Sequence, residues 1–160
     1  MGHFQYSVQV NAPQDRVFQV TSDIPNAANT IEGITNIEML TEGPVGVGTA
    51  WKETRKMFGK EHSETMEITG FDPPRSYTVG SESCGALWSS TFAFTPENGG
   101  TRVDFDFLTK PLTFWAKVMS VVTAPMMRSM MKKCVNADLQ NLKAACENGN
   151  AATSTQAATA

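Results

Sequence analysis

The spacing of apolar residues changes at Pro111, and this change constrains the fold more than any single motif. Before it, apolar and polar residues alternate, as in "TRVDFDFLT", where Val103, Phe105 and Phe107 share one face. After it, apolar residues recur at helical spacing as far as Gly149. Alternation is typical of half-buried strands, and a period of about 3.6 residues is typical of an amphipathic helix. The sequence therefore predicts a run of strands followed by one long C-terminal helix.

The N-terminal part of the chain adds a strand and two short helices. "HFQYSVQV" alternates and predicts a strand. "NAPQDRVFQVTSD" has Asn11 and Pro13 where a helix begins, and "IPNAANTIEGI" indicates a second short helix or helical turn ending near Gly33. Six further strands follow before the long helix. A curved antiparallel sheet of about seven strands around that helix is the economical way to bury the inner face, so the predicted class is α+β.

Within the C-terminal helix we expect a bend and a buried stripe. Pro125 lies inside the helical run, where a proline removes a hydrogen bond and bends the helix. The stripe beyond it comprises Met127, Met131, Val135, Leu139, Leu142 and Cys146. Asn148-Gly149 is the expected end of the helix. The sequence predicts one domain over residues 1–149 and a disordered, low-complexity tail over residues 150–160.

The glycine-rich stretch "TEGPVGVGTAW" raises the question of a phosphate-binding loop. Such a loop requires backbone N–H groups that lead into a helix, whereas this stretch leads into an alternating strand and lacks GK[ST]. We therefore expect Gly43, Gly46 and Gly48 to provide positive φ angles between two strands.

Charge and cysteine content exclude several classes of protein. A net charge of −3 gives no electrostatic reason to expect nucleic-acid binding. The N-terminus lacks the pattern of a signal peptide, and the three cysteines have no CxxC spacing, which indicates reduced thiols and a cytoplasmic location. Lys117 and Arg128 interrupt the apolar part of the C-terminal helix, so no stable membrane insertion is expected.

Several segments, in their order and spacing, carry a resemblance to a known family. These are "VQVNAPQDRVFQVTSDIPNAANTIEGITNIEML", "GPVGVGT", "ITGFDPPRSY", "FTPENGGTRVDFDF" and "DLQNLKAACE". Together they resemble the START-like, Bet v 1-like (SRPBCC) superfamily, most closely its polyketide cyclase/dehydrase-like branch. The resemblance implies a helix-grip fold with a deep cavity between sheet and long helix. It also implies that a lipid, sterol, polyketide or other hydrophobic small molecule is the partner.

Alternation indicates which side chains line such a cavity. The expected ligand-binding residues are Trp51, Glu53, Arg55, Met57, His62, Glu64, Met66, Trp88, Phe92, Phe105, Met127 and Met131. Aromatic residues at strand spacing also pack as ordinary core, so each aromatic position has this second interpretation. Met126, Met127, Met130 and Met131 favour a pocket that adapts to ligand shape, because methionine is flexible.

Four polar residues in the inward register leave three interpretations open. Pairing around the turn at Gly59-Lys60 would bring Arg55 near Glu64 or His62. These residues and Glu53 would form structural ion pairs, orient a ligand, or take part in catalysis. A β-bulge would instead turn them outward.

The residues identify no catalytic set, no metal site and no cofactor. His62 with Glu53 and Glu64 falls short of a metal centre, and no Ser-His-Asp or Cys-His arrangement is recognisable. Three functions remain: a carrier of a hydrophobic molecule, a cyclase or dehydratase acting in the same cavity, and an interaction module. The last would resemble an Hsp90 activator or touch a membrane through residues 114–122. The oligomeric state is not predicted.

Overall fold

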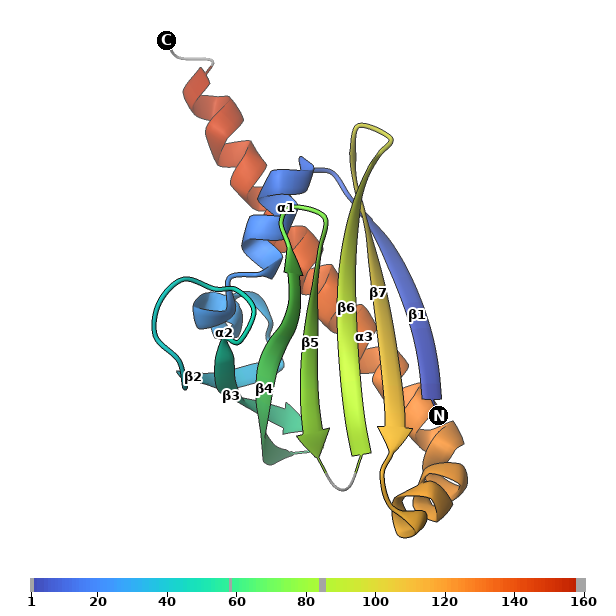
Figure 1. Ribbon diagram of the computed structural model, residues 1–160. Helices are drawn as coiled ribbons and strands as arrows, with labels where there is room; N and C mark the ends of the chain where they lie inside the picture. The colour runs from blue at the N-terminus through green and yellow to red at the C-terminus, as the bar shows by residue number, and fades with distance from the viewer. Residues whose placement is uncertain (1, 58, 84–85, 158–160) are drawn as a thin grey trace.

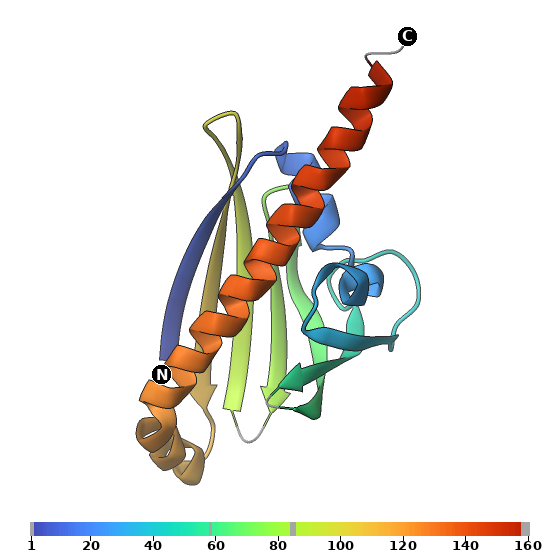
Figure 2. The same cartoon turned by 180° about the vertical axis from the view of Figure 1, so that it is seen from behind.

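The strands form one antiparallel sheet that curves around a long helix (Figures 1 and 2). The computed structural model describes residues 2–57, 59–83 and 86–157. It describes their side chains except at positions 57, 83, 114–116, 118–120, 122–124, 127 and 149–157. The strand order is β1-β7-β6-β5-β4-β3-β2, so the first strand pairs with the last.

The strands are β1 (Gly2–Val10), β2 (Ile34–Met39), β3 (Ala50–Met57), β4 (Lys60–Asp72), β5 (Ser76–Ser83), β6 (Ala86–Glu97) and β7 (Gly100–Pro111). Between β1 and β2 lie α1 (Gln14–Thr21), the 3-10 turn η1 (Ile24–Asn26) and α2 (Ala27–Thr30), and the chain closes with α3 (Phe114–Ala157). This order confirms the predicted α+β helix-grip fold with seven strands.

Tight turns set the register of the sheet. Asn98 and Gly99 both have positive φ, at 50° and 74°, and form a two-residue turn between β6 and β7. Asn-Gly favours such a turn because its backbone matches the twist of the flanking strands. In the loop before β3, Gly43 and Gly48 have positive φ as predicted, whereas Gly46 does not. The resulting pairing aligns Phe105 with Phe92 on one side and with Tyr6 on the other.

Helix α3 crosses the concave face of the sheet. Val135, Leu139, Leu142 and Cys146 of the predicted stripe are buried, and Met131 packs against them half-buried. Pro125 lies inside the helix, and Figure 2 shows the first turns of α3 set at an angle to the remainder. The helix continues to Ala157, so the stop predicted at Asn148-Gly149 is wrong. The domain boundary at residue 149 stays a prediction.

Candidate functional site

Burial changes along the inner face of the sheet. On β1, Val10 is 1% exposed, whereas Val8, Tyr6 and Phe4 on the same face are half-buried. Strands β4 and β7 show the same gradient, from Ile68 to Glu64 and from Val103 to Thr109. The packed half of the inner face comprises Val10, Ile68, Tyr77, Phe94 and Val103, and the open half comprises Phe4, Tyr6, Glu64, Met66, Trp88, Phe92 and Thr109.

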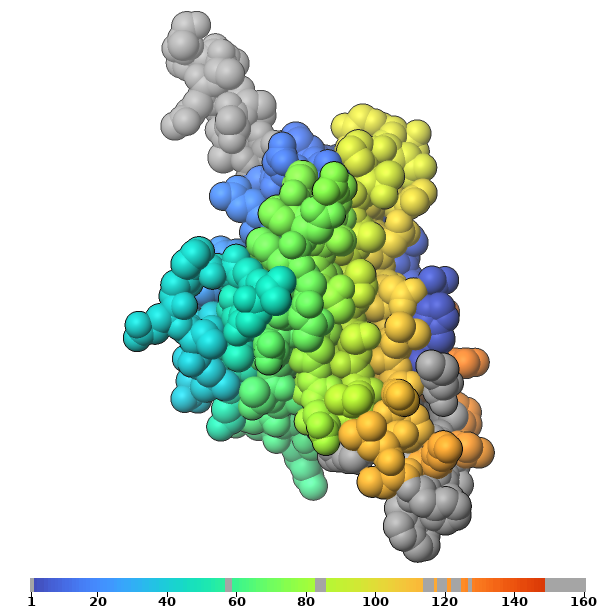
Figure 3. Space-filling view, in the orientation of Figure 1, coloured from blue at the N-terminus to red at the C-terminus, as the bar shows by residue number. Residues whose placement is uncertain are grey.

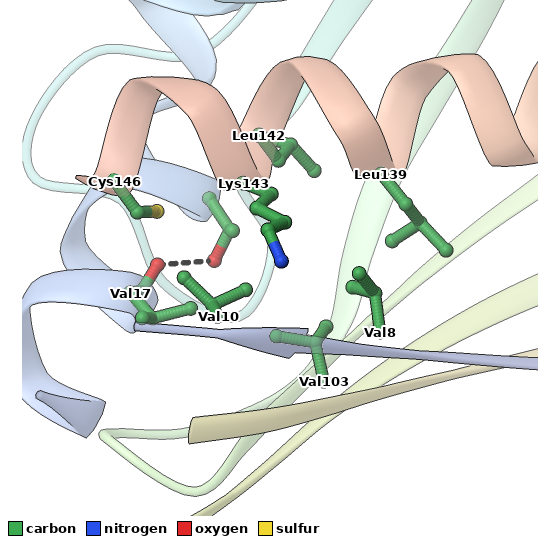
Figure 4. Close-up of a pocket in the computed structure, with 9 residues that line it drawn as sticks. Val8, Val10, Val17, Val103, Leu139, Leu142, Lys143 and Cys146 are labelled. Atoms are coloured by element: carbon green, nitrogen blue, oxygen red, sulfur yellow. Dashed lines mark hydrogen bonds between the residues drawn. The ribbon is translucent and has the colours of Figure 1, made fainter. Parts of the chain in front are cut away.

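The packed half is closed by α1 and by the later turns of α3. Val17, Leu139, Leu142 and Cys146 meet Val8, Val10 and Val103 there (Figure 4). The space that these side chains leave does not admit a water molecule. Tyr77 is fully buried, and its hydroxyl donates to the Thr21 carbonyl oxygen at 2.8 Å. The deep cavity that the family resemblance implies therefore does not extend into this half.

The open half presents aromatic rings on neighbouring strands. The Phe107 ring centroid lies 6.1 Å from that of Phe4 and 5.7 Å from that of Trp88. Phe92 stacks on Tyr77 at 4.9 Å and meets the edge of Phe105 at the same distance. Offset and edge-to-face rings of this kind form a rigid apolar wall. Phe105 and Phe107 are each only 7% exposed, so the accessible part of the wall comes from Phe4, Tyr6, Trp88 and Phe92.

A cluster of three charged residues lies beside this wall. The Arg55 guanidinium donates through Nε to Glu53 and through Nη1 to Asp138 Oδ2 at 2.7 Å. The second oxygen of Glu53 accepts from the Trp51 indole at 3.4 Å. Glu53 is 6% exposed, while the Arg55 and Asp138 side chains are about a quarter exposed. The cluster joins β3 to α3, and one cation between two carboxylates leaves it with a net negative charge.

The environment shifts the protonation equilibria of the cluster in physically distinct ways. Burial by itself lowers the pKa of Arg55, but Asp138 and Glu53 outweigh it and raise that pKa overall. Burial raises the pKa of Asp138 and, together with repulsion from Glu53, exceeds the opposing effect of Arg55. Arg55 is thus held as a cation between two carboxylates, and Asp138 is a weaker acid than an ordinary aspartic acid side chain.

Glu64 forms a separate contact in the open half. It lies directly opposite Glu53 in the pairing of β3 with β4. Its Oε1 accepts a hydrogen bond from the Trp88 indole at 3.1 Å, which crosses strand β5. His62 is opposite Arg55 in the same register, as predicted, but its side chain is exposed. Arg55 bonds to Glu53 and Asp138 and not to Glu64 or His62.

The structure brings most predicted ligand-binding residues to one face. Trp51, Glu53 and Phe105 are buried, and Arg55, Glu64, Met66, Trp88, Phe92 and Met131 are half-buried. His62 lies exposed near the β3–β4 turn. The side chains of Met57 and Met127 lie outside the described residues. No bulge turns the β3 and β4 residues around, since their pairing from Ala50 to Met57 is continuous.

Sequence reasoning missed Asp138. It sits next to Leu139 of the buried stripe, where a carboxylate is costly unless it is paired. That position was a signal that the side chain meets a cation, but nothing in the sequence identified Arg55, 83 positions earlier, as its partner.

A second hollow lies on the other side of the sheet. It is a groove of about 690 Å³ whose outward-facing residues include Thr65, Glu67, Glu82, Leu87 and Leu108. Figure 3 shows the sheet from this side, and Figure 1, in the same orientation, shows α3 behind the strands. Met66, Trp88 and Thr109, which belong to the open half of the inner face, also line this groove.

Among the described residues, no group of three or more His, Cys, Asp or Glu side chains could hold a metal ion. In the same part of the chain no helix is long and apolar enough to span a membrane.

The comparison with family profiles decides the family. The profile described as polyketide cyclase / dehydrase and lipid transport matches residues 1–147. The chain belongs to this family. A separate search of curated protein sequences found no match. The START-like, Bet v 1-like fold of this chain recurs in solved structures of low sequence identity, which bear on the fold alone.

Three of these structures illustrate how similar their folds are to that of this chain. TTHA0849 from Thermus thermophilus is 18% identical with a TM-score of 0.75, over 91% of this chain and 97% of that one. The Zhui aromatase/cyclase from Streptomyces sp. R1128 is 17% identical with a TM-score of 0.72, over 91% and 93%. The di-domain ARO/CYC StfQ from the steffimycin biosynthetic pathway is 14% identical with a TM-score of 0.76, over 94% of this chain and 51% of that one.

Proposed function

We propose that this family member binds a hydrophobic small molecule between the open half of the inner face and α3. The observation that carries the proposal is the incomplete burial of Phe4, Tyr6, Trp88 and Phe92, which point inward. Leaving apolar surface in water costs about 25 cal/mol per Å². A ligand that covers these rings would remove that cost.

The chemistry of the wall supports a bulky, largely apolar ligand. Ring faces and edges suit a polycyclic or aromatic molecule, and Met66 and Met131 adapt to ligands of differing outline. The polar groups at its border are the carboxylate of Glu64 and the Glu53–Arg55–Asp138 cluster. A ligand with a hydroxyl group or another hydrogen-bond donor would find an acceptor in Glu64.

A binding titration with a paired variant tests this proposal. A hydrophobic fluorophore should bind the folded protein saturably and be displaced by sterols or fatty acids. Met66→Trp fills the open half and should weaken binding by about tenfold, equivalent to about 1.4 kcal/mol. Thr65→Trp is the matched control, because Thr65 is exposed on the opposite face of the same strand. Equal affinities for the two variants would refute the site.

A second candidate is cyclisation of a polyketide-like chain in the same place. It is supported by the family description and by Glu64, whose Oε1 is held by the Trp88 indole. The carboxylate would take a proton from the carbon between two carbonyl groups. The resulting carbanion would attack a third carbonyl carbon and close the ring. The alkoxide so formed would take the proton back from the Glu64 carboxyl group, and loss of water would follow.

Glu64→Gln separates the two functions. The amide oxygen can still accept from the Trp88 indole, but the side chain no longer takes a proton. If the protein is a cyclase, this variant should bind a synthetic polyketide thioester normally and fail to release water from it, as measured by mass spectrometry. Wild-type protein that leaves the thioester unchanged would exclude the cyclase and leave the binding function standing.

A further inference from the structure

Charge is distributed unevenly along this acidic chain. Residues 107–137, here termed the cationic segment, hold Lys110, Lys117, Arg128, Lys132 and Lys133 and not one Asp or Glu. The rest of the chain has eight basic residues against sixteen acidic ones. The segment covers the end of β7 and the first part of α3. If acidic residues were spread evenly along the chain, a stretch of this length would contain several of them.

The same segment exposes large apolar side chains. Leu108 is 42% exposed, Leu112 is 46% exposed, Val121 is 75% exposed and Met126 is 68% exposed. Arg128, Lys132 and Lys133 are also exposed, and none of them belongs to an ion pair among the described residues. A single exposed apolar residue is ordinary, but four of them in one segment with cations that lack an ion-pair partner form a distinctive surface.

This surface lies at one end of the molecule. The first turns of α3 extend beyond the end of β7 and the start of β1 (Figures 1 and 2). Gly2 pairs with Thr109 at that end, and Trp88 pairs with Thr109 from the other side. The Arg128 guanidinium lies 5.5 Å from the centre of the Phe4 ring. The cationic segment therefore borders the open half of the inner face.

We propose that the cationic segment docks the protein on an anionic lipid bilayer. Lys and Arg side chains are attracted to acidic headgroups, and the apolar side chains between them enter the boundary between headgroups and acyl chains. Charge complementarity selects this occupant over a neutral bilayer. Docking is peripheral, since no helix among the described residues could span the membrane.

The orientation would bring the open half against the lipid. A molecule of low solubility could then pass between bilayer and protein without crossing water. Docking itself requires only the surface residues, so it stands whether or not the ligand site is confirmed.

Vesicle flotation tests the proposal directly. Wild-type protein should float with vesicles of phosphatidylcholine mixed with phosphatidylglycerol and stay in solution with phosphatidylcholine alone. Added salt should release it. Lys132→Gln/Lys133→Gln should weaken the partition by about fivefold for each cation removed. Val121→Ser/Met126→Ser should weaken it by about tenfold, because both apolar side chains are replaced by a short polar one.

Matched controls change the same chemistry elsewhere. Lys52→Gln/Lys60→Gln removes two exposed cations from β3 and β4, and Val47→Ser changes a side chain that is 68% exposed in the glycine-rich loop. These variants should float like wild type, and all variants should retain the wild-type melting temperature and fluorophore affinity in the absence of vesicles. Wild-type protein that does not float with anionic vesicles would overturn the proposal. The proposal would also be overturned if the control variants lost as much partition onto anionic vesicles as the segment variants do.

Discussion

The two halves of the inner face come from the same strands and the same alternation, yet they differ in what covers them. The packed half lies under α1 and the later turns of α3, and its side chains leave no room for water. In the open half, inward rings such as Phe4 and Trp88 stay half-buried, and charged residues lie among them. Strand alternation thus decides which way a side chain points, and the covering helix decides whether it becomes core.

The largest expected effect is a loss of core packing. Leu139→Ala in the packed half should lower the free energy of unfolding by about 3 to 4 kcal/mol, because the cavity cannot collapse fully. Met131→Ala, which is half-buried at the border of the open half, should cost about 1 kcal/mol. Urea unfolding measures both, and fluorophore binding should weaken only for Met131→Ala. Similar costs for the two variants would erase the distinction between the halves.

The charged cluster should be nearly as sensitive. Arg55→Met leaves two carboxylates without their cation and should cost about 3 kcal/mol. Much of that loss should return in Arg55→Met/Asp138→Asn, since one stranded charge is removed. Arg75→Met is the surface control: Arg75 pairs with Asp72 at 2.8 Å in solvent, and no measurable loss is expected in urea unfolding.

The same variants decide what Arg55 does. If Arg55→Met keeps its stability but loses affinity for ligands with a carboxylate or carbonyl group, Arg55 orients ligand and the cluster is not structural. The geometry favours the structural role, because Nε and Nη1 of its guanidinium already donate to carboxylates.

A smaller effect is the dependence of folding stability on pH that arises from two carboxyl groups. The pKa of Asp138 is raised by burial, so the folded protein holds this proton more tightly than the unfolded chain does. Its contribution to stability is therefore lost as pH rises from about 4 through the raised pKa. The pKa of Asp106 is lowered, first by its hydrogen bond with His3, so its contribution is lost as pH falls.

Comparison with Asn variants isolates each group. The stability advantage of wild type over Asp138→Asn should shrink as pH rises, while its advantage over Asp106→Asn should grow. Urea unfolding over the acidic range measures both differences. Slopes of the same sign would contradict the assignment of Asp138 to a buried environment.

The smallest effect concerns reactivity and not stability. Burial in the packed half raises the pKa of the Cys146 thiol to about 11. In a Cys84→Ser/Cys134→Ser background, labelling of Cys146 by iodoacetamide should be more than about a hundredfold slower than in unfolded protein. Rapid labelling of the folded protein would mean that the packed half opens readily.

Local patterns in the sequence were sufficient for the architecture. The change of period at Pro111 and the stripe through Val135 and Leu139 predicted elements that the structure contains. They succeed because side-chain direction in a strand or helix depends on near neighbours alone. The inward direction of Glu53, Arg55 and Glu64 follows from the same rule.

Only the tertiary structure decided which side chains pair with one another and which part of the sheet the helices cover. Arg55 pairs with Asp138 on α3, and Glu64 accepts from Trp88 two strands away, because folding brings distant segments within hydrogen-bond distance. The end of α3 at Ala157 and the exposure of His62 also differ from what spacing suggested. Periodicity determined which side chains share a face of a strand or of the long helix. Which of these faces meet depends on how the helix crosses the sheet, and no local pattern encodes that crossing.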